Sequence, residues 1–208
     1  MYNTPRYSTA RNDGPTQTVI DTTSIIAQEE IYSTKRLNAP HAPGQNAFGE
    51  HNDLKVGGDG INTLSVTGDN NYLEGDDGSD ILSAIGDGNR IYGAEGNDEL
   101  YAKGNSNGLF GNGGDDVLEA IGEDNGIFGG EGNDALYAEG NSNGLFGNGE
   151  DDVLVAIGED NGIFGGEGND AIDELYAKGD SNKLEGEAGD SCTAEGTTNI
   201  VECVAAPP

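Results

Sequence analysis

Six aspartates recur every 18 residues, and each closes a glycine-rich hexapeptide that could bind a cation. They are Asp80, Asp98, Asp116, Asp134, Asp152 and Asp170. Hard divalent cations take about six to eight oxygen ligands from carboxylates and carbonyls, and glycine lets a tight turn point its carbonyls inward. Candidate carbonyl ligands are therefore Gly93, Gly96, Gly111, Gly113, Gly129, Gly132, Gly147, Gly149, Gly165 and Gly168. The alternative is that the six aspartates are solvated turn residues.

A second hexapeptide alternates with the first, and its sixth residue is asparagine. These asparagines are Asn71, Asn89, Asn107, Asn125, Asn143, Asn161 and Asn182. Alanine and a larger residue replace the leading glycine pair, as in AKGNSN at 102–107. Asparagine keeps an oxygen without the charge, and stacked identical amides can hydrogen-bond along the stack. We therefore expect metal at the aspartates and a structural asparagine column opposite, with Glu123–Asp124 and Glu159–Asp160 as secondary candidates for weak binding.

Both hexapeptides belong to an internal repeat. Residues 107–135 recur 36 positions later, and only two of the 29 positions differ: Gly114 becomes Glu150, and Glu119 becomes Val155. Each nonapeptide has six turn-forming residues and then a three-residue strand with Leu or Ile at its centre, which points to one face. The pattern predicts an all-β fold, a right-handed parallel β-roll (β-solenoid) of about seven 18-residue turns over residues 57–185. One three-residue insertion lies near Ile172–Glu174.

The span 57–185 resembles the RTX (hemolysin-type) calcium-binding nonapeptide-repeat family. The closest matches are GDDGSD (75–80), GAEGND (93–98) and GGEGND (129–134 and 165–170), with looser copies at 111–116 and 147–152. The resemblance implies several Ca²⁺ ions bound between successive loops. Since stacked aspartates repel one another without metal, we expect the coil to fold only when calcium is present.

The remaining segments are predicted to flank the coil. Residues 1–56 are expected to form an N-terminal arm and linker, and residues 186–208 a C-terminal cap of the kind that repeat rods require. Cys192 and Cys203 lie eleven residues apart, which fits a small disulfide loop in an oxidising compartment. The alternative is two unpaired cysteines in a cytosolic protein.

An aromatic stripe is predicted on the outer face of the asparagine-side sheet. It consists of Tyr92, Phe110, Phe128, Phe146 and Phe164, beside glycines at 108, 126, 144 and 162. Contiguous exposed apolar patches usually mark an interface. Two alternatives are that the rings stack on one another and cover the glycines, or that the N-terminal arm covers them.

Composition excludes several classes of function. With 39 acidic and 9 basic residues, the formal net charge of −30 argues against nucleic-acid binding. No apolar run approaches the roughly 20 residues that span a bilayer, and residues 1–15 lack the apolar region of a Sec-type signal peptide. The two histidines, His41 and His51, have no metal-ligand spacing, and no catalytic constellation is visible, so we expect no enzymatic activity.

These features favour a secreted calcium-binding structural protein of the extracellular space or cell surface, from a bacterium and exported without a Sec-type signal. Its expected partners are copies of itself or a cell-surface or matrix component. One alternative is an ice-binding β-roll, although charged turns at every second position suit ice poorly. The other is a non-catalytic module of a secreted carbohydrate-active enzyme or protease.

Overall fold

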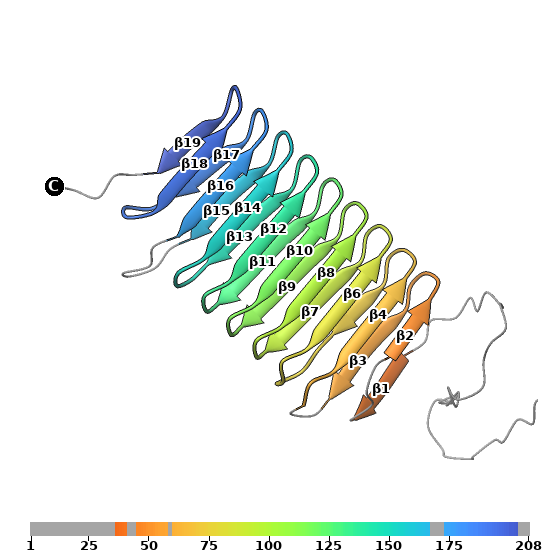
Figure 1. The fold of residues 1–208 in the computed structure, drawn as a ribbon. Coiled ribbons are helices and arrows are strands. Elements are labelled where there is room, and N and C mark those ends of the chain that lie inside the picture. The colour runs from red at the N-terminus through yellow and green to blue at the C-terminus, as the bar shows by residue number, and fades with distance from the viewer. Residues whose placement is uncertain (1–35, 41–44, 58–59, 167–172, 204–208) are drawn as a thin grey trace, which may run out of the picture.

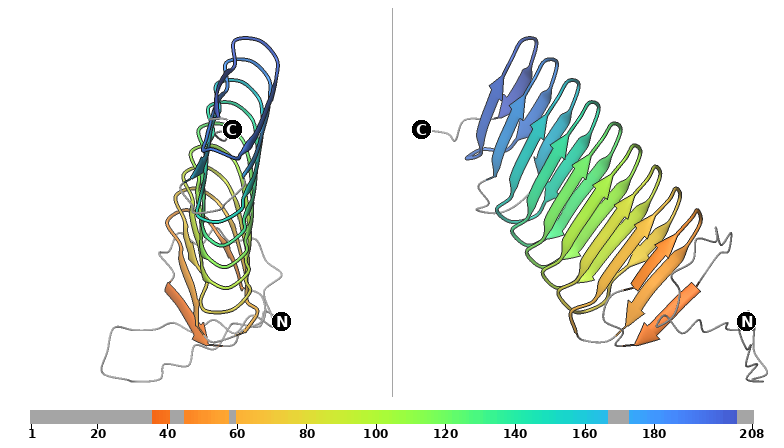
Figure 2. Two further views of the ribbon diagram at one scale, coloured as in Figure 1. Left: turned by 90° about the vertical axis from the view of Figure 1, so that its left-hand side faces the viewer. Right: turned by 45° about the vertical axis from the view of Figure 1, so that its right-hand side comes forward.

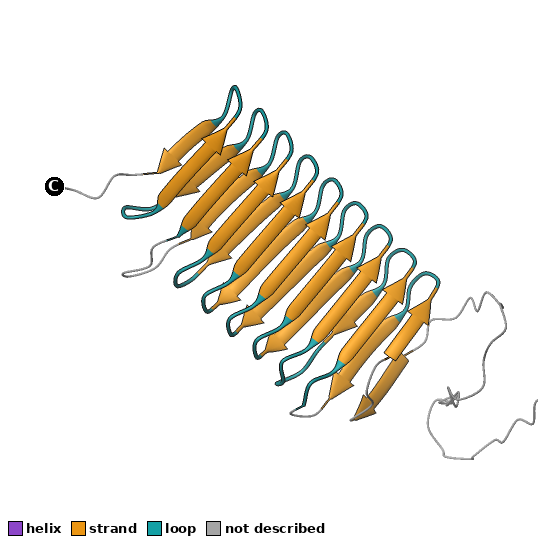
Figure 3. Ribbon diagram, viewed as in Figure 1, coloured by secondary structure: helices purple, strands orange, loops and turns teal. Residues whose placement is uncertain are grey.

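The computed structural model describes residues 36–40, 45–57, 60–166 and 173–203, and in these ranges the chain is a coil of parallel strands without helices (Figures 1 and 3). The strands are β1 (Arg36–Pro40), β2 (Gln45–Phe48), β3 (Asp53–Gly57), β4 (Thr63–Thr67), β5 (Tyr72–Glu74), β6 (Ile81–Ile85), β7 (Arg90–Glu95), β8 (Glu99–Lys103), β9 (Gly108–Gly113), β10 (Val117–Ile121), β11 (Gly126–Glu131), β12 (Ala135–Glu139), β13 (Gly144–Asn148), β14 (Val153–Ile157), β15 (Gly162–Gly166), β16 (Glu174–Lys178), β17 (Lys183–Gly186), β18 (Ser191–Glu195) and β19 (Ile200–Cys203). In the part of the chain so described, no helix offers an apolar span long enough for a bilayer.

Odd-numbered and even-numbered strands form two separate sheets. The described odd strands make a ten-stranded sheet from β1 to β19, and the even strands a nine-stranded sheet from β2 to β18. Neighbouring strands in each sheet are parallel and in register, as where Leu118 pairs with Leu100 on one side and Leu136 on the other. Each 18-residue turn of the coil therefore contributes one strand to each sheet, and the end-on view in Figure 2 shows the flattened cross-section. The parallel β-solenoid expected from the repeat is confirmed.

Two columns of inward-facing side chains fill the space between the sheets. One column consists of the strand-centre Leu and Ile residues, which are 0 to 2 % exposed from Leu54 to Leu184. The five-residue strands of the nine-stranded sheet add a second inward position, occupied by small residues such as Ala102 and Ala120. In the ten-stranded sheet the corresponding position is glycine, as at Gly111 and Gly129. Burial of one Leu stabilises the fold by roughly 1.5–3 kcal/mol, so the stacked columns hold the coil together.

The coil extends beyond the predicted span of 57–185 in both directions. Strands β1 to β3 lie in the segment expected to be arm and linker, and β18 and β19 lie in the segment expected to be the cap. Asn52 and Asn199 continue the asparagine column, but their spacings to the next member are 19 and 17 residues. These one-residue shifts break the nine-residue phase in the sequence, while backbone pairing of parallel strands tolerates them. The predicted arm before residue 36 lies outside the described residues.

A disulfide joins the last two strands. Cys192 in β18 is bonded to Cys203 in β19, with a Cα–Cα distance of 6.3 Å. Cys192 is in register with Leu175 of the core column, and Cys203 is in register with Gly186. The bridge therefore links the two sheets across the interior of the final described turn.

Candidate metal sites on the aspartate edge

The turns of the coil form two edges that differ in their sixth residue. We call the turns that lead from the ten-stranded to the nine-stranded sheet the aspartate edge, and those that lead back the asparagine edge. In Figure 1 the aspartate edge is the lower-left row of turns and the asparagine edge the upper-right row. The members of the aspartate column are Asn62, Asp80, Asp98, Asp116, Asp134, Asp152, Asp173 and Asp190.

One carboxylate oxygen of each aspartate holds the preceding turn. The backbone N–H of Asp98 donates to Oδ1 of Asp116, and the N–H of Asp116 donates to Oδ1 of Asp134, at 2.7 and 2.8 Å. The same bond recurs along the column between 2.7 and 3.1 Å. This ladder aligns the carboxylates in one row, and Asp80, Asp98, Asp116, Asp134 and Asp152 are only 1 to 2 % exposed.

The second carboxylate oxygen is buried and has no hydrogen-bond partner at four successive aspartates: Asp98, Asp116, Asp134 and Asp152. Each of these Oδ2 atoms lies over the first glycine of its own loop. A Cβ added to Gly111 would lie within 3.0 Å of Asp116 Oδ2 and also of the carbonyl oxygen of Gly129 in the next turn. A carboxylate oxygen and a backbone carbonyl of successive turns therefore converge on one point, and both are acceptors.

This close approach, rather than positive φ, explains the first glycine of each loop. Gly93, Gly111, Gly129, Gly147 and Gly165 have no positive φ, and neither do Gly113 and Gly149. Positive φ occurs at the second and fourth loop positions, including Gly96 and Gly132 of the predicted set. We expected glycine to be needed for turn conformation throughout. The structure shows that the first glycine is needed because the carboxylate occupies the space of its Cβ.

Burial raises the pKa of all four aspartates to about 7. Desolvation is the largest cause, and the neighbouring column carboxylates raise the pKa further, as Asp134 does for Asp116. The backbone N–H that each Oδ1 accepts lowers the pKa but does not outweigh burial. Ionised at neutral pH, the row would be a line of buried, desolvated charges that requires either protons or cations.

Calcium fits this arrangement. The unpaired Oδ2 atoms are anionic ligands, the adjacent glycine carbonyls are neutral oxygen ligands, and Ca²⁺ prefers this donor set. The described residues contain no group of three or more His, Cys, Asp or Glu side chains placed to hold a metal ion. Backbone carbonyls must therefore supply a large part of any coordination, as the glycine-lined loops allow.

The two ends of the aspartate column depart from the predicted set. Asp170 and Gly168 lie outside the described residues, and Asp173 takes the column position that we assigned to Asp170: its Oδ1 accepts the N–H of Asp152 at 2.9 Å, across 21 residues. The three-residue insertion lies before Asp173, which shifts the column residue by three. At the other end, Asp80 Oδ2 accepts the N–H of Asp76 at 2.9 Å.

The asparagine edge has the same ladder but no unpaired acceptor. The N–H of Asn107 donates to Oδ1 of Asn125 at 2.9 Å, and the bond recurs from Asn52 to Asn199 between 2.7 and 2.9 Å. The amide nitrogen Nδ2 donates to the next Oδ1 in the first five members and to a turn carbonyl at Asn143, Asn182 and Asn199, whereas Nδ2 of Asn161 is buried without a partner. All seven predicted asparagines lie in this buried column.

The secondary candidates on the asparagine edge lie in exposed turns. The backbone N–H of Glu123 donates to Oδ1 of Asn105 at 2.8 Å, and that of Glu159 to Oδ1 of Asn141 at 2.9 Å. Asp124 and Asp160 adopt a left-handed conformation with φ of 57°. The side chains of all four acidic residues are exposed, and no bond in the turn brings them together.

The predicted aromatic stripe is a continuous stack of rings. From Tyr92 to Phe164 successive ring centroids are 4.6 to 5.0 Å apart and nearly parallel, and Tyr72 extends the stack at 5.1 Å. Each Phe ring lies over the glycine two residues before it, such as Gly126 under Phe128. A lysine covers each end: Lys55 over Tyr72 and Lys183 over Phe164. The ring faces are used within the stack, which favours local stacking over an external interface.

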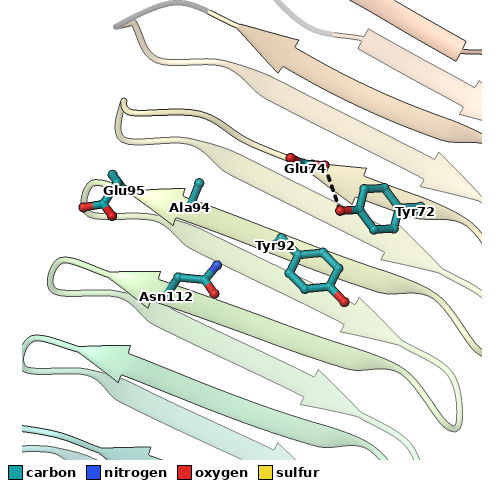
Figure 4. Close-up of a pocket in the computed structure, with 6 residues that line it drawn as sticks. All are labelled: Tyr72, Glu74, Tyr92, Ala94, Glu95 and Asn112. Carbon is teal, nitrogen blue, oxygen red and sulfur yellow. Dashed lines mark hydrogen bonds between the residues drawn. The ribbon is translucent and has the colours of Figure 1, made fainter.

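A shallow hollow of about 300 Å³ lies beside the first rings of the stack (Figure 4). It is lined by Tyr72, Glu74, Tyr92, Ala94, Glu95 and Asn112. Glu74 accepts hydrogen bonds from Tyr72 Oη at 2.7 Å and from Lys55 Nζ, and the bond from Lys55 lowers the pKa of Glu74. An ionised carboxylate held by a lysine is unsuited to act as a general acid, so this hollow does not suggest catalysis.

Comparison with known proteins agrees with this geometry. A family model described as RTX calcium-binding nonapeptide repeat (4 copies) matches residues 56–84, 85–118, 110–145, 120–154 and 167–190. The matches span residues 56–154 and 167–190, which are 99 and 24 of the 208 residues. No curated protein and no solved structure matches the chain.

Proposed function

The chain belongs to the family of RTX calcium-binding nonapeptide repeats, and from this premise we propose that it is a secreted structural protein whose β-roll folds on calcium and then self-assembles or adheres outside the cell. As a member of this family with a β-solenoid fold, it is a calcium-binding structural module. Export, calcium-dependent folding and assembly are the proposed steps.

The row of unpaired, buried Oδ2 atoms carries the proposal. Four such atoms follow one another along the aspartate edge, each beside a glycine carbonyl of the next turn. A metal-free coil would hold these acceptors against one another, and each buried unpaired charge costs several kcal/mol. Calcium bound between turns would convert the same contacts into ligand bonds, so binding and folding are one equilibrium.

Three observations support a location outside the cell. RTX repeats are typical of extracellular, secreted proteins. The Cys192–Cys203 disulfide is stable in an oxidising compartment. A net charge of −30 keeps the metal-free chain expanded where free calcium is scarce, as in a cytosol, and the coil would form where calcium is plentiful.

A scaffold or adhesive role is supported by how the coil uses its residues. The aspartates of the six-residue loops are explained by the aspartate column, and the described side chains form no catalytic arrangement that we recognise. We propose that the protein acts through its surface, with copies of itself or a cell-surface or matrix component as partner, rather than through catalysis.

Far-UV circular dichroism and sedimentation velocity with calcium and with chelator test this function. We expect a disordered, expanded monomer in chelator, and β-structure with oligomers or filaments in millimolar Ca²⁺. Magnesium at equal concentration is the control, because it prefers octahedral, water-rich coordination and should not fold the coil. Equal folding in chelator would contradict calcium-dependent folding, and calcium-dependent folding without any association would contradict the assembly role.

A further inference from the structure

The outer face of the nine-stranded sheet is an exposed surface with a regular pattern that the aspartate and asparagine edges do not explain. Each five-residue strand from β4 to β18 points its first, third and fifth side chains outward. Along this face Ile81, Ile85, Val117 and Val153 are 42 %, 49 %, 53 % and 44 % exposed. Large apolar side chains exposed in register on a chain of charge −30 call for a partner.

Two kinds of row alternate along this face. The aliphatic rows are β6, β10 and β14, whose first and fifth residues are Ile or Val, as in Val117 and Ile121. The tyrosine rows are β8, β12 and β16, which have Tyr at the centre. Rows β8 and β16 share the sequence ELYAK, with glutamate at one side of the face and lysine at the other.

We propose that this face binds the same face of a second copy of the chain, with the two-fold axis along the coil. This inference rests on the proposed function, because the face exists only in the folded coil. In that arrangement each row meets its own counterpart running in the opposite direction. Aliphatic rows meet aliphatic rows, and Val117 of one copy lies opposite Ile121 of the other.

Charge complementarity favours a second copy of the chain as the partner of this face. When β8 meets its reversed counterpart, Glu99 lies opposite Lys103 of the second copy and Lys103 opposite Glu99. The same two pairs are open to Glu174 and Lys178 of β16, where Lys178 Nζ also lies 4.0 Å from a carboxylate oxygen of Glu195 in its own chain. Within the described chain, Glu99 and Lys103 take part in no ion pair. The two lysines of the face, Lys103 and Lys178, each stand at the opposite end of a row from a glutamate, so reversal of the second copy brings unlike charges together.

The area of the face is sufficient for a weak dimer. Eight strands at about 4.8 Å spacing and five residues at about 3.3 Å give a footprint of roughly 38 Å by 16 Å, or roughly 600 Å² per copy. Two copies would bury roughly 1,200 Å², which is at the lower end of specific interfaces.

One residue in the centre of the face opposes the pairing. Glu119 in β10 would meet Glu119 of the second copy, whereas the corresponding residue of the next repeat, Val155 in β14, would meet another valine. Glu119→Val therefore removes a repulsion without altering either edge of the coil. We expect this variant to tighten the dimer by about tenfold.

Sedimentation equilibrium in saturating calcium, from micromolar to millimolar protein, tests the proposal. We expect a monomer–dimer equilibrium that Lys103→Glu weakens about tenfold, and that the double swap Glu99→Lys/Lys103→Glu restores, because the reversed rows again pair opposite charges. Ile61→Glu is the matched control, since Ile61 is 74 % exposed in a turn of the aspartate edge and should leave the dimer unchanged.

Three results would overturn the dimer: a wild-type chain that stays monomeric at all concentrations, a double swap that fails to restore association, or a chain that dimerises only after residues 1–35 are deleted. The last would assign the face to that segment. Circular dichroism of the same samples reports calcium-dependent folding separately, so a failure of the dimer is distinguishable from a failure of the proposed function.

Discussion

The two edges of the coil are built on the same ladder and differ by one atom per turn. On both, the backbone N–H of one column residue donates to Oδ1 of the next. On the asparagine edge the other atom is Nδ2, a donor that finds an acceptor in the stack or in a turn at every described member except Asn161. On the aspartate edge, at Asp98, Asp116, Asp134 and Asp152, it is Oδ2, an acceptor that faces a carbonyl acceptor. In the described asparagine column only Asn161 Nδ2 is buried without a partner, whereas in the aspartate column four successive buried oxygens lack a donor and need a proton or a cation.

The two edges also differ in the number of residues between one column residue and the next along the chain. The step across the asparagine edge is nine residues at all eight described places, from Asn62–Asn71 to Asp190–Asn199. The step across the aspartate edge is nine in the middle of the coil but ten at Asn52–Asn62, twelve at Asn161–Asp173 and eight at Asn182–Asp190. The amide ladder thus keeps the register, and the loops that can change length lie on the aspartate edge.

Converting the aspartate edge into an asparagine edge by substitution should have the largest effect. Replacing Asp98, Asp116, Asp134 and Asp152 by Asn keeps the Oδ1 ladder and puts a donor where the unpaired oxygen lies. We expect this variant to show β-structure in chelator by circular dichroism, and to need no calcium for it, because the amide can donate to the glycine carbonyl.

The reverse substitution is its control. Asn107→Asp and Asn125→Asp place charges in loops whose first residue is alanine instead of glycine. Each should destabilise the calcium-loaded coil by about 1–3 kcal/mol without adding bound ions. A four-fold Asn variant that stays disordered in chelator would show that the unpaired oxygens are not what prevents metal-free folding.

Protonation of the four aspartates should have the same effect as their replacement by asparagine, which is to allow the coil to form without calcium. The pKa of each of the four aspartates is about 7 in the coil, against about 3.9 in an unfolded chain. Between these values the coil binds more protons than the unfolded chain, so its metal-free stability falls as the pH rises, by up to a few kcal/mol per carboxyl.

Circular dichroism of calcium-free protein, prepared on chelating resin, measures this dependence. We expect β-structure to increase as the pH falls from about 7 towards about 4, while the calcium concentration at the folding midpoint rises, since binding requires ionised carboxylates. The four-fold Asn variant should lose most of this pH dependence. A metal-free chain that is equally disordered throughout the range would contradict the assignment.

The first position of each hexapeptide gives a matched pair of substitutions. In Gly129→Ala the new Cβ would lie within 3.0 Å of Asp134 Oδ2 and of the carbonyl oxygen of Gly147. We expect a loss of about 3 kcal/mol or more in urea unfolding with saturating calcium, and weaker calcium binding. Ala120→Gly at the equivalent place on the asparagine edge should cost only about 1 kcal/mol and leave calcium affinity unchanged. Equal effects of the two would remove the distinction between the edges.

Substitution of Glu150 has the smallest expected effect, because it changes backbone strain in one loop only. It has φ of 69° at the fourth loop position, where the preceding repeat has Gly114. Glu150→Gly should stabilise the calcium-loaded coil by about 0.5–1 kcal/mol, since left-handed φ is costly for glutamate. Urea unfolding measures the change, and Glu123→Gly, at a position without positive φ, is the control that should not stabilise the coil.

The sequence predicted the fold and both columns because every turn repeats one local rule. Leu or Ile at each strand centre predicted the core, and the sixth residues predicted which side chains would stack. Asp173 was missed because the insertion before it leaves Asp170 as the apparent column residue in GGEGND. Strands β2, β3, β18 and β19 were missed because a single residue more or less in an aspartate-edge loop hides nonapeptides such as AFGEHNDLK at 47–55.

Neither the reason for the first glycine of each loop nor the pattern on the nine-stranded sheet could be predicted from the sequence, because both depend on the folded structure. A one-dimensional repeat shows that glycine recurs, but the contact of its missing Cβ with Oδ2 depends on how the aspartate side chain folds back. Likewise, Glu99 and Lys103 lie four residues apart in the sequence, and only the flat sheet places them at opposite sides of one row.

Anomalous diffraction from crystals grown with calcium tests the difference between the edges most directly. We expect calcium peaks between successive aspartate-edge loops, beside Oδ2 of Asp98, Asp116, Asp134 and Asp152, and no peaks in the asparagine column. Peaks of similar height at both edges, or calcium bound only to exposed carboxylates such as Glu123 and Glu159, would contradict this expectation.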